Sequence, residues 1–199
     1  MRLAIFAVLI ALMIPFFNAA YSAPKTEYIS LKPDSCKTPD DSVYDYYSSR
    51  GLIVSECSTN TTVQSLPLRL FIVSTDERSW IDLAIGNTIW SSEQEIVYKK
   101  ENQFGYFPNV GHTPAELRTS PAGAVGLIFR VTAQNIDQQL SNSGISSVSR
   151  LFVFSFRNSK VCFLGLTRSN TTARNLLDSD AACKRMLKNE KLNEEKQQK

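Results

Sequence analysis

The sequence predicts an α+β fold in which a mostly antiparallel β-sheet is covered by a C-terminal helix and held by two disulfides. Segments with alternating apolar and polar residues follow one another between residues 51 and 168, and short turn signals separate them. One apolar stripe at helical spacing comes after them. A run of strands followed by one helix is typical of α+β domains.

Residues 1–23 are typical of a signal peptide for export. Arg2 supplies the positive start, Leu3–Phe17 is apolar, and Asn18–Ala23 contains mostly small residues. The apolar run of 15 residues is shorter than the ~20 that span a bilayer. We therefore expect cleavage after residue 22 or 23, no membrane span in the mature protein, and a periplasmic or secreted location.

The composition predicts one domain without a nucleic-acid partner. About 176 residues remain after cleavage, and the net charge falls from +3 to +2 with the loss of Arg2. Six of the basic residues lie in Lys184–Lys199 with three Glu, so the globular part offers no broad basic face for phosphates. We divide the mature chain into an irregular lead-in (24–42), one globular α+β domain (43–188) and a charged flexible tail (189–199).

The four cysteines all lie in the mature chain, and an even number in an exported protein indicates disulfides. Three pairings are possible. Two cysteines lie toward each end of the chain, 21 residues apart in both cases, so we favour pairing within each end. This gives Cys36–Cys57 and Cys162–Cys183. A zinc site would need closer spacing such as Cys-x-x-Cys, which does not occur, and we expect no metal.

The first half of the domain is predicted to consist mainly of strands. Val43–Tyr47 is short and aromatic, and its tyrosines are typical of half-buried strand residues. Gly51–Cys57 is the first convincing strand. Leu66–Ser74 alternates and forms a hairpin with the next apolar segment, 77–86. Ser91–Tyr98 fits either a strand or a short helix.

Strands resume after residue 115 with 116–119 and 124–134. Asn135–Ser149 is long and polar, and we expect an extended hairpin loop there. The strongest hairpin joins 150–158 to 160–168, with three phenylalanines on one face that must be covered. They are Phe152, Phe154 and Phe156.

A helix that begins at Thr171 or Thr172 is the expected cover for this aromatic face. Its apolar stripe would be formed by Ala173, Leu176, Leu177, Cys183, Met186 and Leu187. A helix that folds back in this way would bring Cys183 close to Cys162. Beyond Leu187 the charged sequence should fray into solvent.

Motifs for catalysis are absent from the chain. There is no G-x-S-x-G elbow, no phosphate-binding glycine loop, and no cysteine left free once both disulfides form. His112 is the only histidine, and it lies in a loop between glycines and prolines without an evident catalytic partner. We interpret this histidine as a turn residue, and we expect no cofactor.

Five stretches together resemble a family of small exported proteins of alphaproteobacteria, mostly from rhizobial relatives. They are "YYSSRGLIVSEC", "FGYFPNVGHTPAELR", "VGLIFRV", "KVCFLGL" and "NTTARNLLDSDAAC". The resemblance spans residues 44–185 and implies that the four cysteines are structural. It also implies a shared loop formed by Phe104, Gly105, Phe107, Asn109 and Gly111. His112 has no counterpart in the family, and the chain departs from it at "PAELR" and in the longer 135–149 loop.

These observations predict an exported, disulfide-stabilised, non-enzymatic binding protein with a protein partner. The residues of the shared loop together with His112 form its candidate interaction loop. A secreted effector directed at a host is an extension of this hypothesis. The alternatives are a periplasmic hydrolase that uses His112, and a periplasmic carrier that binds a small ligand on the aromatic face beneath the helix.

Overall fold

The computed structural model describes residues 24–75, 77–136, 144, 146–179 and 181–192. The predicted signal peptide and residues 193–199 of the predicted tail lie outside this part of the chain. Strands dominate the described residues, all their pairs are antiparallel, and two disulfides are present. The predicted fold class is confirmed.

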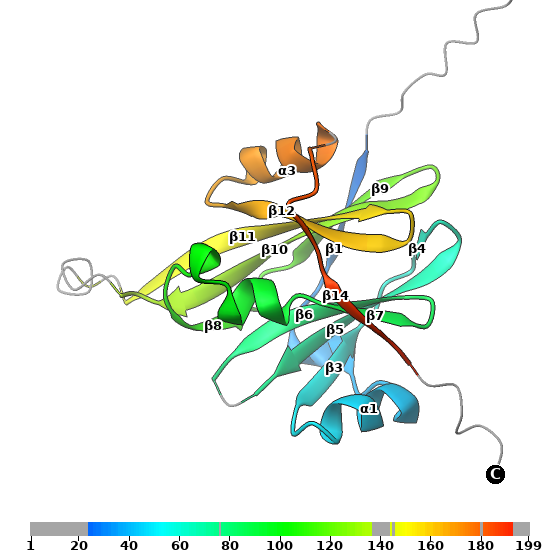
Figure 1. Ribbon diagram of the computed structural model, residues 1–199, viewed down its shortest axis with the longest axis horizontal. Coiled ribbons are helices and arrows are strands. Elements are labelled where there is room, and N and C mark those ends of the chain that lie inside the picture. The colour runs from blue at the N-terminus through cyan, green and yellow to red at the C-terminus, as the bar shows by residue number, and fades with distance from the viewer. Residues whose placement is uncertain (1–23, 76, 137–143, 145, 180, 193–199) are drawn as a thin grey trace, which may run out of the picture.

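The strands divide into two sheets that lie one above the other in Figure 1. Sheet A contains β1 (Lys25–Ile29), β8 (Tyr106–Val110), β9 (Ala115–Ser120), β10 (Gly123–Gln134), β11 (Ser147–Arg157), β12 (Lys160–Thr167) and β13 (Arg185–Met186). Sheet B contains β2 (Cys36–Lys37), β3 (Ile53–Cys57), β5 (Leu66–Ser74), β6 (Ser79–Ile85), β7 (Thr88–Ser91) and β14 (Lys188–Lys191). The short strand β4 (Thr62–Val63) pairs with both β5 and β10 and joins the sheets.

Helices cover the outer faces of this arrangement. In Figure 1, α3 (Asn170–Asp178) lies over sheet A and α1 (Asp41–Ser48) lies beneath sheet B. The shorter helices are η1 (Pro33–Ser35), the π-helical turn η2 (Gln94–Tyr98) and η3 (Lys100–Asn102). Among the described helices, none has the length and apolar character needed to cross a bilayer.

The predicted hairpins form because their alternating residues bury one or both faces. In β5–β6, Leu70 pairs with Leu83 on the face turned toward sheet A, while Phe71 pairs with Asp82 on the face turned toward α1. β12 pairs with β11 from one end to the other, from Lys160 to Thr167. The predicted loop 135–149 is shorter than expected at its end, because β11 already begins at Ser147; residues 137–143 and 145 lie outside the described part.

The aromatic face of β11 is covered by other strands, and the prediction that the C-terminal helix covers it is wrong. Phe152, Phe154 and Phe156 belong to the main core between the sheets, where Phe129 stacks on Phe154 at 5.6 Å between ring centroids. α3 packs on the opposite face of β11, against Leu151 and Val153. The rings therefore lie inside the core, and the site expected for a ligand carrier beneath the helix does not exist there.

Helix α3 approaches sheet A closely and is held by ion pairs. A Cβ atom added at Gly126 would lie 2.4 Å from a Leu177 methyl group, so only glycine fits beneath the helix. Arg118 bonds both oxygens of Asp178 at 2.7 and 3.0 Å. Arg174 bonds Glu116, which is almost fully buried. These charged hydrogen bonds fix the helix to β9.

The helix begins and ends earlier than predicted. Ser169, rather than Thr171 or Thr172, is the N-cap, and its side chain accepts a hydrogen bond from the Thr172 amide. The helix ends at Asp178, so Cys183 and Leu187 lie on the extended segment that follows. These residues belong to a segment that pairs with β12 rather than to a helix: the Leu187 amide donates to the Val161 carbonyl at 3.0 Å.

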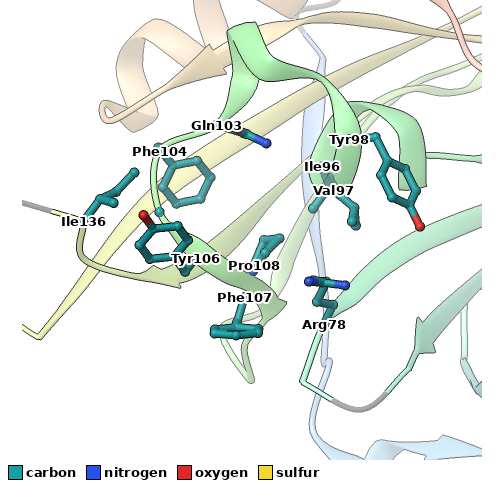
Figure 2. A pocket seen from close by; sticks show the side chains of 11 residues that line it. Arg78, Ile96, Val97, Tyr98, Gln103, Phe104, Tyr106, Phe107, Pro108 and Ile136 are labelled. Carbon is teal, nitrogen blue, oxygen red and sulfur yellow. The ribbon is translucent and has the colours of Figure 1, made fainter.

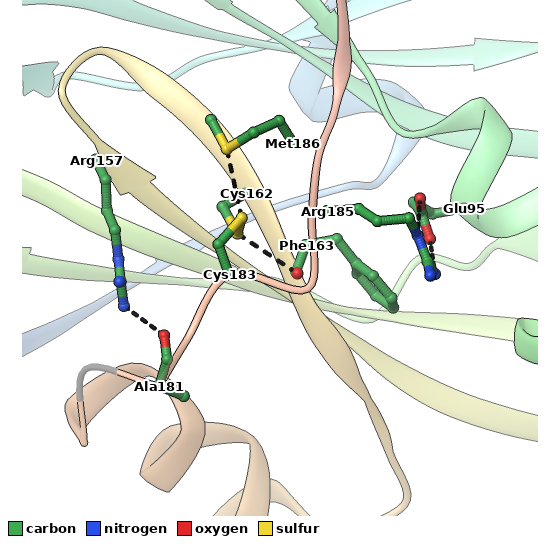
Figure 3. The surroundings of a disulfide bond; sticks show 8 residues. All are labelled: Glu95, Arg157, Cys162, Phe163, Ala181, Cys183, Arg185 and Met186. Carbon is green, nitrogen blue, oxygen red and sulfur yellow. Dashed lines mark hydrogen bonds and ion pairs between the residues drawn. A yellow bond between two sulfur atoms is a disulfide. The ribbon is translucent and has the colours of Figure 1, made fainter.

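The C-terminal segment 183–192, named the strap, closes the open side of the two sheets. β13 pairs with β12 in sheet A, and β14 pairs with β7 in sheet B. Figure 3 shows the Cys162–Cys183 bond at its start and the Arg185–Glu95 pair further on. The predicted flexible tail is therefore wrong for residues 189–191, since backbone pairing holds this charged stretch.

Two further expectations for the N-terminal residues are also wrong. The lead-in 24–42 was expected to be irregular, but β1 pairs along its whole length with β9 and buries Ile29. Val43–Tyr47 was expected to be a strand and is part of α1. Asp40 caps this helix through the Val43 amide, and Val43 and Tyr47 bury the face formed by positions i and i+4.

A buried carboxyl group links α1 to sheet B. Tyr47 donates its hydroxyl proton to Asp82 at 2.9 Å, and the Ser92 amide donates to the other oxygen at 3.2 Å. Asp82 has no cationic partner among the described residues. Burial raises the pKa of Asp82 to about 7, although these hydrogen bonds oppose the shift. Burial beside this carboxyl group also raises the pKa of Tyr47.

We expect Asp82 to make the protein less stable as the pH rises from 4 to 7. In this window the carboxyl of the unfolded chain is ionised, while that of the folded protein still binds a proton. The contribution of Asp82 to the free energy of unfolding is therefore complete below pH ~4. It falls by ~1.4 kcal/mol per pH unit as the pH rises to the pKa of the folded state. The measurement is urea denaturation of wild type and Asp82→Asn across pH 4–8. The difference between the two proteins isolates this group, and a difference that does not change with pH would contradict the prediction.

We expect removal of either disulfide to cost ~3 kcal/mol, because both join cysteines 21 residues apart. Only Cys162→Ala/Cys183→Ala should free the strap. Its release is measured by faster hydrogen exchange at the Leu187 and Leu192 amides, which bond the carbonyls of Val161 and Asn87. Cys36→Ala/Cys57→Ala is the matched control. Unchanged protection of Leu187 in the first variant would show that hydrogen bonds alone hold the strap.

Candidate interaction surface

The predicted interaction loop is a strand with its two flanking turns. Phe104 and Gly105 precede β8, Phe107 and Asn109 lie within it, and Gly111 begins the connection to β9. The six residues therefore remain neighbours, but their side chains face different surroundings. Only the first part of the segment borders a cavity.

His112 is exposed in the connection between β8 and β9. Within the described part of the chain, it forms no hydrogen bond or ion pair. Nor does any described group of three His, Cys, Asp or Glu side chains come close enough to hold a metal ion. Among the described residues, no carboxylate pairs with this histidine, so the geometry gives the hydrolase hypothesis no support.

Strand β8 is bulged where it borders the cavity. Asn109 pairs with Thr132, and Tyr106 pairs with Gln134, so the two residues Phe107 and Pro108 oppose a single residue of β10. Phe107 has a φ of +49°, a left-handed conformation that is strained for an aromatic residue and costs ~1–3 kcal/mol. The bulge turns the Phe107 ring outward, and 38% of the residue's surface is exposed.

The residues before the bulge fix it to the core. A Cβ atom at Gly105 would lie 2.4 Å from the Gln134 carbonyl oxygen, so glycine is required for β8 to approach β10. The Phe104 ring packs against Phe152 with 6.3 Å between centroids. This part of the segment is structural, as the predicted shared loop implied, whereas Tyr106 and Phe107 point away from the core.

Together with η2, these residues line a groove with a volume of about 210 Å³. Figure 2 shows its aromatic side chains around the opening, with Ile136 on one side and Arg78 on the other. The groove is lined by Arg78, Ile96, Val97, Tyr98, Gln103, Phe104, Gly105, Tyr106, Phe107, Pro108 and Ile136. We name this surface the aromatic groove. Tyr98 and Tyr106 are more than half exposed, so apolar rings face solvent here.

Arginine guanidinium groups lie over two of these rings. Arg78 lies 5.6 Å from the centroid of the Phe107 ring, and Arg150 lies 5.3 Å from that of Phe104. Burial lowers the pKa of Arg150, and the neighbouring charge of Arg168 lowers it further. The surroundings of the groove are thus basic, although the chain as a whole is close to neutral.

A second cavity, of about 360 Å³, lies between η2 and the strap. Two of its charged groups, Glu95 and Arg185, are already engaged with each other. Arg185 bonds both oxygens of buried Glu95 at 2.6 and 2.8 Å, and Asn102 donates to the same carboxylate. This cavity is therefore part of the attachment of the strap, and we favour the aromatic groove as the functional surface.

Of the residues that line the groove, the sequence predicted only Phe104, Gly105 and Phe107. Arg78, Tyr98, Gln103 and Ile136 were not among the candidate residues. The segment 91–98 fitted two structures equally, and it forms the end of β7 followed by η2. π-helical turns are rare and frequently occur at functional sites, but no simple residue pattern in this segment distinguishes one from a helix or a strand.

Comparisons of the chain with protein-family models, curated proteins and solved structures found no match. The resemblance to exported alphaproteobacterial proteins therefore stays a prediction.

We expect Phe107→Gly to change the free energy of unfolding by less than ~1 kcal/mol, because glycine relieves the positive φ and offsets the lost ring contact. Phe104→Ala is the comparison, and it should cost ~2 kcal/mol or more because its ring packs on Phe152. Urea denaturation of both variants measures this. If Phe107→Gly costs as much as Phe104→Ala, the exposed ring serves the fold rather than a partner.

Proposed function

We propose that the protein is an exported, disulfide-stabilised binding protein that contacts a partner protein through the aromatic groove. The single observation that carries this proposal is Phe107, an aromatic residue kept in a strained conformation with its ring directed outward. Strain of this kind persists only when the surrounding structure imposes it, and it concentrates at binding and catalytic sites.

The surroundings of Phe107 support recognition of a protein. Exposed tyrosine, phenylalanine and arginine side chains are enriched in the contact residues of protein interfaces. Tyr106 and Phe107 lie on a strand that is fixed to the core by Phe104 and Gly105, so little conformational freedom would be lost on binding. The groove holds no described nucleophile beside a base, which gives an enzymatic function no support here.

Export is supported by independent observations. Both disulfides are consistent with an oxidising compartment, extracellular or periplasmic. Residues 1–23 carry the pattern of a signal peptide. The resemblance to exported proteins of alphaproteobacteria points in the same direction, and secretion toward a host remains an extension of the proposal.

Site-specific photo-crosslinking tests this proposal. Benzoylphenylalanine replaces Tyr106 in the groove or, as a control, Tyr44 on α1, which is similarly exposed (58% and 47%). Each variant is expressed with its signal segment and irradiated in the producing cells and in host extract. We expect a protein adduct from position 106 that is absent from position 44. Equal adducts from both positions, or an adduct from position 44 alone, would reject the groove as the binding surface.

A further inference from the structure

The chemistry of the partner follows from the arginines around the groove, and the inference rests on the proposed binding function. Most arginines elsewhere in the described chain are neutralised. Those that form ion pairs include Arg50, Arg69, Arg118, Arg174 and Arg185. No described carboxylate pairs with Arg78, Arg150 or Arg168.

Two of these arginines are neighbours, because β11 and β12 pair Leu151 with Thr167 and so bring Arg150 and Arg168 side by side. The charge of Arg168 acts on Arg150, whose guanidinium is partly buried against Phe104. Like charges held together are unfavourable, and a bound anion removes that cost. The Phe104 side of the groove is therefore complementary to a carboxylate that the described chain does not supply.

Arg78 presents the same chemistry on the other side. It is exposed immediately before β6, and its guanidinium lies over the outward-facing Phe107 ring. Figure 2 shows Arg78 and Ile136 on different sides of the groove, with the rings of β8 between them. Positive charge thus lies on both sides of an aromatic stretch.

The dimensions of the groove favour a peptide over a small molecule. Its volume of about 210 Å³ is below the ~300–1,000 Å³ of most small-molecule pockets, and it suits one large side chain. β8 pairs only with β10 among the described strands, so its other edge has no strand partner up to Val110, whose amide donates to the Ser79 hydroxyl. Extended peptides bind along such edges and place alternate side chains in pockets.

We propose that the aromatic groove binds an extended acidic segment of the partner protein, with one large apolar or aromatic side chain inserted and carboxylates on both sides of it. The inserted side chain contacts Tyr98, Tyr106 and Phe107. The carboxylates pair with Arg78 on one side and with Arg150 and Arg168 on the other. Affinity then depends on ionic strength, because these arginines are near the surface.

The test is selection of random dodecapeptides displayed on phage against the immobilised mature chain, followed by binding of the enriched peptides in solution. We expect peptides rich in Asp and Glu around one aromatic or large aliphatic residue. Arg150→Gln/Arg168→Gln should weaken them at least ~10-fold. The matched control is Arg130→Gln. Arg130 also has no described carboxylate partner, but it pairs with Leu151 on the face of sheet A that carries α3.

The outcomes separate this inference from the proposed function. Peptides that need Tyr106 and Phe107 but show no acidic preference, or bind the double arginine variant equally well, would overturn the acidic partner and leave the groove as a binding surface. Peptides that do not respond to Tyr106→Ala or Phe107→Gly, or no enrichment at all, would count against the groove itself. A dodecanucleotide or phosphatidylserine vesicles could also displace the bound peptides. If either does so at a lower concentration than unlabelled peptide does, the partner is a nucleic acid or an anionic membrane, and the acidic protein segment is overturned.

Discussion

The attachment of the strap by the Arg185–Glu95 pair is the interaction on which the rest of the structure depends. Glu95 is almost fully buried, and both of its oxygens accept hydrogen bonds from Arg185 while Asn102 adds a third donor. A buried carboxylate is costly unless it is satisfied in this way. Because the next residue, Ile96, lines the aromatic groove, the same pair closes the core and sets one wall of the groove.

The opposite wall is held by packing rather than by charge. Phe104 reaches the phenylalanine cluster of the core, and Gly105 lets β8 lie against β10. The bulge that follows leaves Phe107 strained and exposed. A rigid wall on each side means that the groove exists before any partner binds, so that binding energy is not consumed in forming it.

The alternation of apolar and polar residues was sufficient to predict a strand wherever the two strands of one hairpin bury the same face. β5 has the bounds expected from its sequence, and the pairing within each end of the chain gave both disulfides. Patterns failed where a distant element decides the structure. β1 has mostly exposed side chains and forms through its backbone bonds to β9. β14 is equally polar, and its position follows from the edge of β7 that the strap reaches.

The aromatic groove, too, could be predicted only in part from the sequence. Its aromatic residues attract attention in the sequence because several lie close together, but the charge around them is invisible there: a near-neutral composition does not reveal which arginines have partners. Arg118 and Arg174 are neutralised by residues that α3 and β9 bring together, whereas Arg150 and Arg168 flank the pair formed by Leu151 of β11 and Thr167 of β12. An excess of positive charge at one surface is thus produced by the fold alone, and it can be recognised only after every other ion pair has been placed.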